Sequence, residues 1–485
     1  MLHSDDIDNL KAKRICFECV GEAYLSEEIE QKGKIDPCSY CHQTAESYAI
    51  QELAERIETA FEHHYYRTSD QPDSWQQSFL SDRESNYNWE RDGVPVVDAI
   101  EAATDIPQDA AEDVLSVLDD KHDDFELAKM GEETEFSSDS YYEERGTSDR
   151  AWQEEWRAFE RSLKKEARFF SRTAASHLAS VFGGIDKLMT VDGRPLVVDA
   201  GPQFELDNLY RARVFQADDK LLEALCRPDI HLGSPQANFA SAGRMNARGI
   251  SVFYGTTKAS VAIAEVRPPV GSKVAVAMFN IIRPLRLLDL TALEKAQDGG
   301  SIFDPSLKGR LERVAFLKPL SQRITRPVMP DDEVFDYLAT QAIADFLATE
   351  NDPLFDGIIF RSAQMKGGRN VVLFQKAARI VPMELPEGTK IEARSGYDTE
   401  DNWGVDYSVT EHLPSPLSVL AKQDDGWSNF LPSTGPVYEC DDDFRKSTLQ
   451  IDLKCVVVHQ VDWVEYKSTS YKVDRDRYES HNLKF

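Results

Sequence analysis

Residues 243–268 read GRMNARGISVFYGTTKASVAIAEVRP, and they are the most informative segment of the chain. The segment begins with an R-x-N-x-x-G turn, continues into the strand-like run SVFYGT and ends in a short apolar helix that closes on a glutamate. A second segment, FDGIIFRSAQMKGGRNVVLF at 355–374, places a serine after one apolar run and an asparagine before the next. The polar and aromatic candidates in the two segments are Arg244, Asn246, Gly249, Tyr254, Glu265, Ser362 and Asn370.

Short β-rich runs surround these segments from about residue 205. They are LYRARVF, KVAVAMFNI, LRLLDL, GIIFRS and NVVLFQ, with a helical stretch at VFDYLATQAIADFL. This pattern of short apolar runs with one helical stretch predicts a compact mixed α/β domain over residues 205–388. A β-rich C-terminal extension is expected over 389–485, where IDLKCVVVHQVDWVEY predicts a strand pair or one long strand. GGRN at 367–370 is a weak phosphate-loop signal, and a strand-connecting turn is the expected role.

The order Arg244, Tyr254, Glu265 and, after DGIIF, Ser362 resembles the RES-domain family, which is named for its Arg, Glu and Ser. Asn246 and Gly249 fill the family's turn. The run LYRARVF is similar to its opening strand and supplies Arg211, and Asn370 before VVLF also fits. One departure is Met245, where the family often has tryptophan, and this concerns packing only. The resemblance covers roughly residues 205–385.

The resemblance implies a fold related to ADP-ribosyltransferases and a site that consumes NAD⁺ as substrate by breaking its bond to nicotinamide. Arginines suit the pyrophosphate, and either Arg211 or Arg213 could reach it. Tyr254 would stack on the cationic nicotinamide ring, and Glu265 would stabilise the oxocarbenium-like ribose. The implied catalytic residues are Arg244, Tyr254, Glu265 and Ser362, and the implied NAD⁺-binding residues are Arg211, Arg244, Asn246, Tyr254 and Asn370.

The family includes growth-arresting toxins of bacterial toxin–antitoxin pairs, which implies an antitoxin or another inhibitory protein as partner. The acceptor of ADP-ribose stays open between water, phosphate and a macromolecule, which covers a glycohydrolase, a phosphorylase and an ADP-ribosyltransferase. A homodimer also stays open. The alternatives are a non-catalytic module that senses NAD⁺ or ADP-ribose, and a ribonuclease of the HEPN type.

Four of the seven cysteines form one spaced cluster, Cys16-x2-Cys19 and Cys38-x2-Cys41. This spacing is typical of two knuckles that close one tetrahedral thiolate site for structural Zn²⁺. Residues 1–45 are therefore expected to form a zinc knuckle, with His42 as a less favoured ligand and unligated thiols as the alternative. Cys226, Cys440 and Cys455 are interpreted as ordinary core or surface residues. The odd cysteine count indicates a reducing compartment.

Residues 46–190 are expected to form a helical, acidic domain, similar to those sometimes fused to RES units. Apolar spacing predicts helices from Tyr48 to Phe61 and around Val114–Leu118, an exposed loop over 122–150, and an amphipathic helix from Trp152 to Val181 that Gly183-Gly184 ends. Arg172 and His177 form an R-x4-H pair that resembles the motif of HEPN ribonucleases, and Arg56 with His63-His64 is an equally weak match. Five residues turn a helix by about 140°, so such a pair would not share one face.

The chain has 485 residues, which suggests about three folded units. Its net charge is −30, and residues 1–150 hold 38 Asp and Glu against 13 Lys and Arg. An acidic surface repels phosphate backbones, so nucleic-acid binding through broad electrostatics is not expected. No run approaches the roughly 18 uncharged apolar residues of a membrane helix, and the acidic start does not resemble a signal peptide. A cytoplasmic location without membrane partners is therefore expected.

Overall fold

The structure is a computed structural model that describes residues 4–82, 84–166, 171–326, 328–398, 403–414, 443–465 and 467–477. The chain divides into two compact units. One comprises Met1–Val181, Ile185–Leu196 and Ala292–Ser321, and the other comprises Phe182–Gly184, Val197–Thr291 and Gln322–Phe485. Both helices and strands are abundant, which confirms the α+β class. Among the described residues, no helix combines the length and apolarity needed to cross a membrane.

The N-terminal unit is mainly helical, as predicted. Its helices are α1 (Ser4–Ala12), α2 (Ala23–Lys32), α3 (Ile50–His64), α4 (Ser74–Ser81), α5 (Val96–Thr104), α6 (Gln108–His122), α7 (Phe125–Met130) and α8 (Arg150–Lys165), together with most of α9 (Arg172–Phe182) and α13 (Leu307–Thr325). Two small sheets accompany them: β1 (Arg14–Cys16), β3 (Thr44–Ala49) and β2 (Lys34–Pro37), and β4 (Tyr65–Arg67), β6 (Tyr141–Glu144) and β5 (Val94–Pro95). A third pairs β13 (Ala296–Gln297) with β7 (Met189–Thr190).

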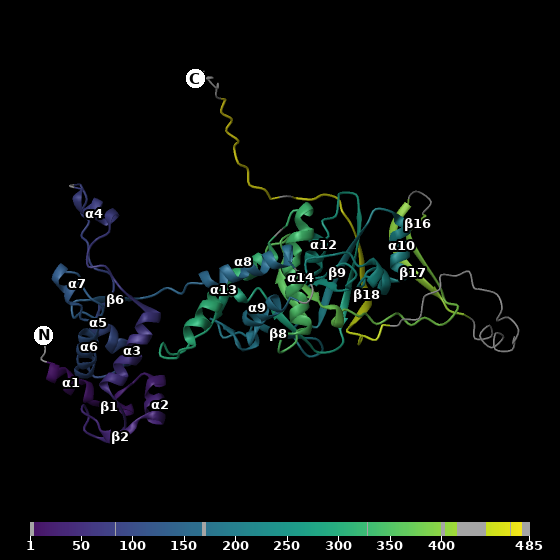
Figure 1. The fold of residues 1–485 in the computed structure, drawn as a ribbon. Helices are drawn as coiled ribbons and strands as arrows, with labels where there is room; N and C mark the ends of the chain where they lie inside the picture. The colour runs from purple at the N-terminus through teal and green to yellow at the C-terminus, as the bar shows by residue number, and fades with distance from the viewer. Residues whose placement is uncertain are drawn as a thin grey trace. The chain divides into compact units, whose positions relative to one another are not determined.

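One apolar core joins helices α2, α3, α5 and α6 of the N-terminal unit. Leu53, Ile57 and Phe61 lie on one face of α3 because their spacing is close to the helical repeat, and all are buried. That face packs beside α6, which contributes Val114 and Leu118 to the same core (Figure 1). Both predicted helices are thus present, although the first begins at Ile50 because Tyr48 lies on β3.

Two predictions for this unit are wrong. The expected loop over 122–150 contains α7 and β6, because the β6 backbone pairs with β4 and β5 and Tyr142 is buried against Phe61 and Phe136. The expected single helix from Trp152 is two helices, α8 and α9. Ala167 and Phe170, part of the pattern that suggested one helix, lie outside the described residues. The predicted stop is confirmed, since α9 ends at Phe182, directly before Gly183.

An eight-stranded sheet forms the centre of the second unit. In order across the sheet its strands are β18 (Leu449–Gln460), β11 (Lys273–Ile281), β9 (Asn208–Phe215), β10 (Phe253–Thr256), β15 (Arg369–Leu373), β14 (Gly357–Arg361), β12 (Leu285–Asp289) and β8 (Val197–Ala200). The strands expected from the apolar runs are all present, and of GGRN the two glycines end the turn between β14 and β15 while Arg369 and Asn370 begin β15. Of the segment 451–466, residues 451–460 lie in one long strand, β18, which pairs with β11, and Tyr466 lies outside the described residues.

The helices of this unit are α10 (Asp218–Cys226), α11 (Pro228–His231), α12 (Ala259–Glu265) and α14 (Glu333–Thr349), and a hairpin joins β16 (Lys390–Asp398) to β17 (Trp403–His412). Helix α12 packs on β9, β10 and β11, and the β16 strand lies beside α10 (Figure 1). Phe253 and Phe279 meet edge to face in the core beneath the sheet. Thr256 pairs with Tyr210 on one side and with Asn370 on the other. Strands β9, β10 and β15 therefore bring three distant segments side by side.

Candidate functional site

The Glu265 carboxylate is held by two side chains from the neighbouring hairpin. Its Oε1 accepts hydrogen bonds from Ser362 Oγ at 2.6 Å and from Asn370 Nδ2 at 2.8 Å. Glu265 is the last residue of α12, Ser362 follows β14, and Asn370 lies on β15. The Ser362 oxygen also accepts from the backbone N–H groups of Gln364 and Met365. With these two donors on its oxygen, the Ser362 hydroxyl directs its own proton to Glu265.

This carboxylate lines a cavity of about 450 Å³. The volume lies within the roughly 300–1,000 Å³ that is usual for small-molecule sites. Of the seven residues predicted for the site, five line the cavity: Arg211, Arg244, Tyr254, Glu265 and Asn370. Ser362 does not line the cavity but donates a hydrogen bond to Glu265. Asn246 lies within the turn that carries Arg244. The fold thus gathers the predicted residues in one region of the second unit.

Arg211 brings an uncompensated positive charge to the cavity. Its Nη1 donates to the Tyr254 carbonyl at 3.4 Å, and the guanidinium lies 5.3 Å from the centre of the Phe253 ring. Burial, together with the nearby charge of Arg213, lowers the pKa of Arg211 to about 10, so it stays charged at neutral pH. No carboxylate of the described residues forms an ion pair with it. A partly buried cation of this kind is stabilised by an anionic ligand.

Arg213, the other arginine of the LYRARVF strand, does not line this cavity. Its Nη1 donates to the His231 carbonyl at 2.7 Å, and its guanidinium lies over Phe215. Of these two arginines, Arg211 is the one that lines the cavity.

Tyr254 and Asn246 shape the turn that presents Arg244. The Tyr254 hydroxyl donates to Asn246 Oδ1 at 3.0 Å and accepts from the Met245 N–H at 3.0 Å. The Asn246 amide nitrogen donates to three backbone carbonyls of the same loop. A Cβ at Gly243 would come within 2.7 Å of Asn246 Oδ1 and of the Tyr254 hydroxyl, so this close approach requires glycine. Burial raises the pKa of Tyr254 to about 12, which keeps the hydroxyl protonated.

Helix α14 holds the same turn from the other side, which the sequence did not reveal. Thr340 Oγ1 donates to the Arg244 carbonyl at 2.5 Å, and Gln341 Nε2 donates to the carbonyls of Gly243 and Asn246. The Arg244 guanidinium lies 5.1 Å from the centre of the Tyr337 ring, and its Nη1 donates to the Ile324 carbonyl. The polar residues of α14 recur at helical spacing, which is the only signal that could have pointed to this role.

The cavity is rich in positive charge although the chain as a whole is acidic. Four arginines line it, together with the two carboxylates of Glu265 and Glu333; the arginines are Arg211, Arg244, Arg267 and Arg361. Guanidinium groups bind phosphate oxygens through paired, charge-assisted hydrogen bonds. The lining therefore suits an anionic ligand that also offers hydroxyl groups to the carboxylates.

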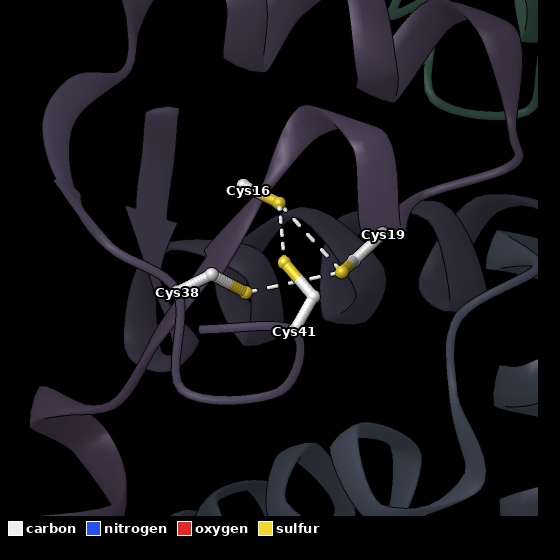
Figure 2. A group of neighbouring side chains, drawn as sticks. All are labelled: Cys16, Cys19, Cys38 and Cys41. Carbon is white, nitrogen blue, oxygen red and sulfur yellow. Dashed lines mark hydrogen bonds between the residues drawn. The ribbon is translucent and has the colours of Figure 1, made fainter. Parts of the chain in front are cut away.

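The four predicted metal ligands converge in the N-terminal unit. Cys16 ends β1, Cys19 ends a short 3-10 helix (Phe17–Cys19), and Cys38 and Cys41 lie in the turn between β2 and β3. Their sulfur atoms point toward one another and all lie within 4.8 Å (Figure 2). The separations from Cys16 Sγ to Cys41 Sγ and from Cys19 Sγ to Cys38 Sγ are 3.5 and 3.8 Å. Four sulfurs at about 2.3 Å from a tetrahedral zinc ion would stand about 3.8 Å apart.

The donor chemistry of this cluster also fits zinc. Burial would raise the pKa of Cys38, but backbone N–H groups of Cys41, Tyr40 and Cys16 lower it to about 7. Burial raises the pKa of Cys16 and of Cys19, and a bound cation would reverse this shift. His42 adopts a left-handed backbone conformation in the turn and does not belong to the converging group. Cys226 and Cys455 lie elsewhere, and Cys440 lies outside the described residues.

The R-x4-H pair does not form a site within α9. The His177 ring is packed against Trp156 and Phe159, with centroid distances of 5.9 and 5.5 Å, and Nδ1 lies 3.5 Å from a Glu155 carboxylate oxygen. Burial lowers the pKa of His177. Arg172 is exposed on the same helix. In the second match, Arg56 forms an ion pair with Glu28. The histidine of α9 is therefore a packing residue in this chain.

These features define an α+β protein with a structural cysteine cluster and a cationic cavity that contains a fixed carboxylate. Two protein-family models match parts of the chain. A family model described as RES domain matches residues 214–391, and one described as HEPN/RES N-terminal domain 1 matches residues 31–177. The chain therefore carries a RES domain preceded by an HEPN/RES N-terminal domain, as its motifs predicted. No curated protein and no solved structure matches it.

Proposed function

We propose that this chain cleaves the bond between nicotinamide and ribose in NAD⁺, as the enzymatic part of a toxin–antitoxin-type module. The RES domain supports a module of that type. The cavity adds a chemical argument, because a dinucleotide with a pyrophosphate and ribose hydroxyls matches a lining of arginines and carboxylates.

The reaction breaks one C–N bond. The electron pair of that bond leaves with the nicotinamide nitrogen, and the pyridinium becomes a neutral ring. The ribose carbon becomes positively charged and is captured by a nucleophile, which is water, phosphate or a macromolecule. A fixed carboxylate such as Glu265 stabilises a charge that appears only in the transition state, and this lowers the barrier.

The other residues bind and orient. Arg211 and Arg244 would hold the pyrophosphate, because both guanidinium groups line the cavity and no carboxylate of the described residues is paired with either. Tyr254 would contribute its ring face to the cationic nicotinamide, since its hydroxyl is already engaged by the turn. Asn246 supports this arrangement through the backbone of the turn.

The proposal rests on one observation, which is that the hydrogen bonds from the described residues to the Glu265 carboxylate are all on one of its two oxygens. Both hydrogen bonds, from Ser362 and from Asn370, end on Oε1. In the described part of the chain, no hydrogen bond ends on Oε2. A carboxylate with one oxygen fixed and the other available suits both charge stabilisation and acceptance of a ribose or nucleophile proton.

We also propose that the cysteine cluster binds one structural zinc ion. Four thiolates would saturate the metal and leave no position for substrate, so Zn²⁺ would stabilise the N-terminal unit without taking part in the reaction. Reduced thiols and a supply of NAD⁺ agree with the cytoplasm as the place of action.

Free nicotinamide released from NAD⁺ by the purified chain tests the proposal. We expect release by the wild type and a loss of 100-fold or more, on the order of an oxyanion-hole deletion, in Glu265→Gln. Glu350→Gln, the same change at an exposed position on the end of α14, is the matched control and should remain active. Binding of NAD⁺ without release would indicate a sensing module, and absence of both would refute the proposal.

Growth of a bacterial host tests the biological role. Induced expression of the wild type should arrest growth and lower cellular NAD⁺, and Glu265→Gln should do neither. Normal growth with an undiminished NAD⁺ pool, at equal amounts of folded protein, would argue against a toxin. A partner that restores growth by binding the wild type would be the antitoxin that the family match leads us to expect.

A further inference from the structure

The cavity contains a second carboxylate, Glu333, that the proposed reaction does not use. Glu333 is the first residue of α14, and Tyr337 follows one turn later on the same face. The Tyr337 hydroxyl donates to Glu333 Oε1 at 3.0 Å, and both side chains line the cavity. The position of this carboxylate is therefore set by the helix and by one hydrogen bond.

Glu333 is also connected to the arginine that we expect to hold phosphate. The ring of Tyr337 carries the Arg244 guanidinium on its face, and the next turn of α14 holds the Arg244 backbone through Thr340. Glu333, Tyr337 and Arg244 thus form one connected group. Glu265 belongs to a different group, which α12 and the β14–β15 hairpin provide.

A dinucleotide carries one ribose on each side of its pyrophosphate. A carboxylate is the usual acceptor for the hydroxyl pair of the adenosine ribose, and it repels a phosphate on the 2′ oxygen. In the proposed reaction Glu265 serves the ribose that loses nicotinamide. The remaining carboxylate, beside a phosphate-binding arginine, has the chemistry that the second ribose requires.

We propose that Glu333 is a specificity-determining residue that binds the unphosphorylated adenosine ribose and so selects NAD⁺ over NADP⁺. This inference rests on the proposed function, because it assigns a role within the same cavity. Tyr337 is a positioning residue that holds the carboxylate through its hydroxyl.

Parallel measurements of nicotinamide release from NAD⁺ and from NADP⁺ test the inference. We expect the wild type to prefer NAD⁺. Glu333→Gln should reduce the ratio of kcat/KM for NAD⁺ to kcat/KM for NADP⁺ by about tenfold, which corresponds to the loss of one hydrogen bond to a charged group. Most of the change should be in KM. Glu333→Lys should reduce the ratio further, and Tyr337→Phe should reduce it less than either.

Asp336→Asn is the matched control, because it removes one negative charge from the same helix at an exposed position that does not line the cavity. It should leave the ratio unchanged. An unchanged ratio in Glu333→Gln, in a protein that melts at the wild-type temperature, would overturn the inference and leave the proposed function intact.

Failure of the proposed function is distinguishable. If the wild type releases nicotinamide from neither dinucleotide, calorimetric binding of NAD⁺ and NADP⁺ replaces the kinetic ratio. Selective binding of NAD⁺ that Glu333→Gln abolishes would support the role of Glu333 in a binding module. Equal binding of the two dinucleotides, or binding of neither, would refute it.

Discussion

Ser362 and Glu265 are 97 residues apart in the sequence, and their side chains meet in a hydrogen bond of 2.6 Å. Because the Ser362 oxygen accepts two backbone N–H groups, its proton can point only toward the carboxylate. The serine therefore acts as a fixed donor that orients Glu265. This geometry gives the Ser and Glu of the family signature a shared role that does not require the serine to be a nucleophile.

Removal of the donors to Glu265 should affect the chemical step more than binding. We expect Ser362→Ala and Asn370→Ala each to lower kcat by about 10- to 100-fold, the weight of one hydrogen bond to a charged group, with KM nearly unchanged. Ser362→Thr keeps a hydroxyl and should recover part of the activity. Steady-state release of nicotinamide measures both constants. A large rise in KM at constant kcat would instead mean that these residues bind substrate directly.

Arg211 should show opposite effects on stability and on binding. Its partly buried charge lacks a carboxylate partner among the described residues, so Arg211→Met should stabilise the free protein by about 1 kcal/mol while weakening NAD⁺ binding by tenfold or more. Arg213→Met, two residues further along β9 and outside the cavity, is the control. Thermal melting with and without NAD⁺ measures both effects. An Arg211→Met protein that NAD⁺ still stabilises as strongly as the wild type would refute the role.

The sequence predicted the strands and the central candidates because both depend on local pattern. Six strands of the central sheet, β9, β10, β11, β12, β14 and β15, are short runs rich in apolar residues, and α12 ends at Glu265. The part played by α14 could not be predicted in the same way. Thr340 and Gln341 donate hydrogen bonds to backbone carbonyls about 95 residues earlier in the chain. Nothing in the sequence of α14 itself identifies those partners.

The errors in the N-terminal unit have a similar origin. The segment 122–150 is acidic and lacks periodicity, but Tyr142 is buried by Phe61, Phe136 and the pairing of β6 with two distant strands. Long-range pairing overrode local composition there. The cysteine ligands were predictable because metal coordination constrains their spacing directly.

His177 should make the N-terminal unit sensitive to acid. Burial between Trp156 and Phe159 lowers its pKa in the folded state below the value of about 6.5 in the unfolded chain, although the nearby Glu155 acts in the opposite direction. The unfolded state then binds more protons, so the stability contributed by neutral His177 is present above pH 6.5 and is lost as the pH falls toward the folded pKa. His177→Phe should flatten this dependence in denaturant titrations between pH 7 and 5. His63→Phe, at the end of α3, is the control, and an unchanged slope in His177→Phe would contradict the assignment.

Removal of metal should unfold the N-terminal unit. Structural zinc sites contribute about 10–16 kcal/mol of binding energy at neutral pH, which exceeds the stability of most domains. We expect one zinc ion per chain by elemental analysis, and a cooperative loss of helical circular dichroism when a strong chelator removes it. Cys19→Ser should lower metal content and melting temperature together, because the remaining three sulfurs no longer complete the tetrahedron. Cys226→Ser, which changes a thiol outside the cluster, should alter neither. A metal-free protein that melts at the same temperature as the wild type would show that packing of these cysteines, and not zinc, stabilises the fold.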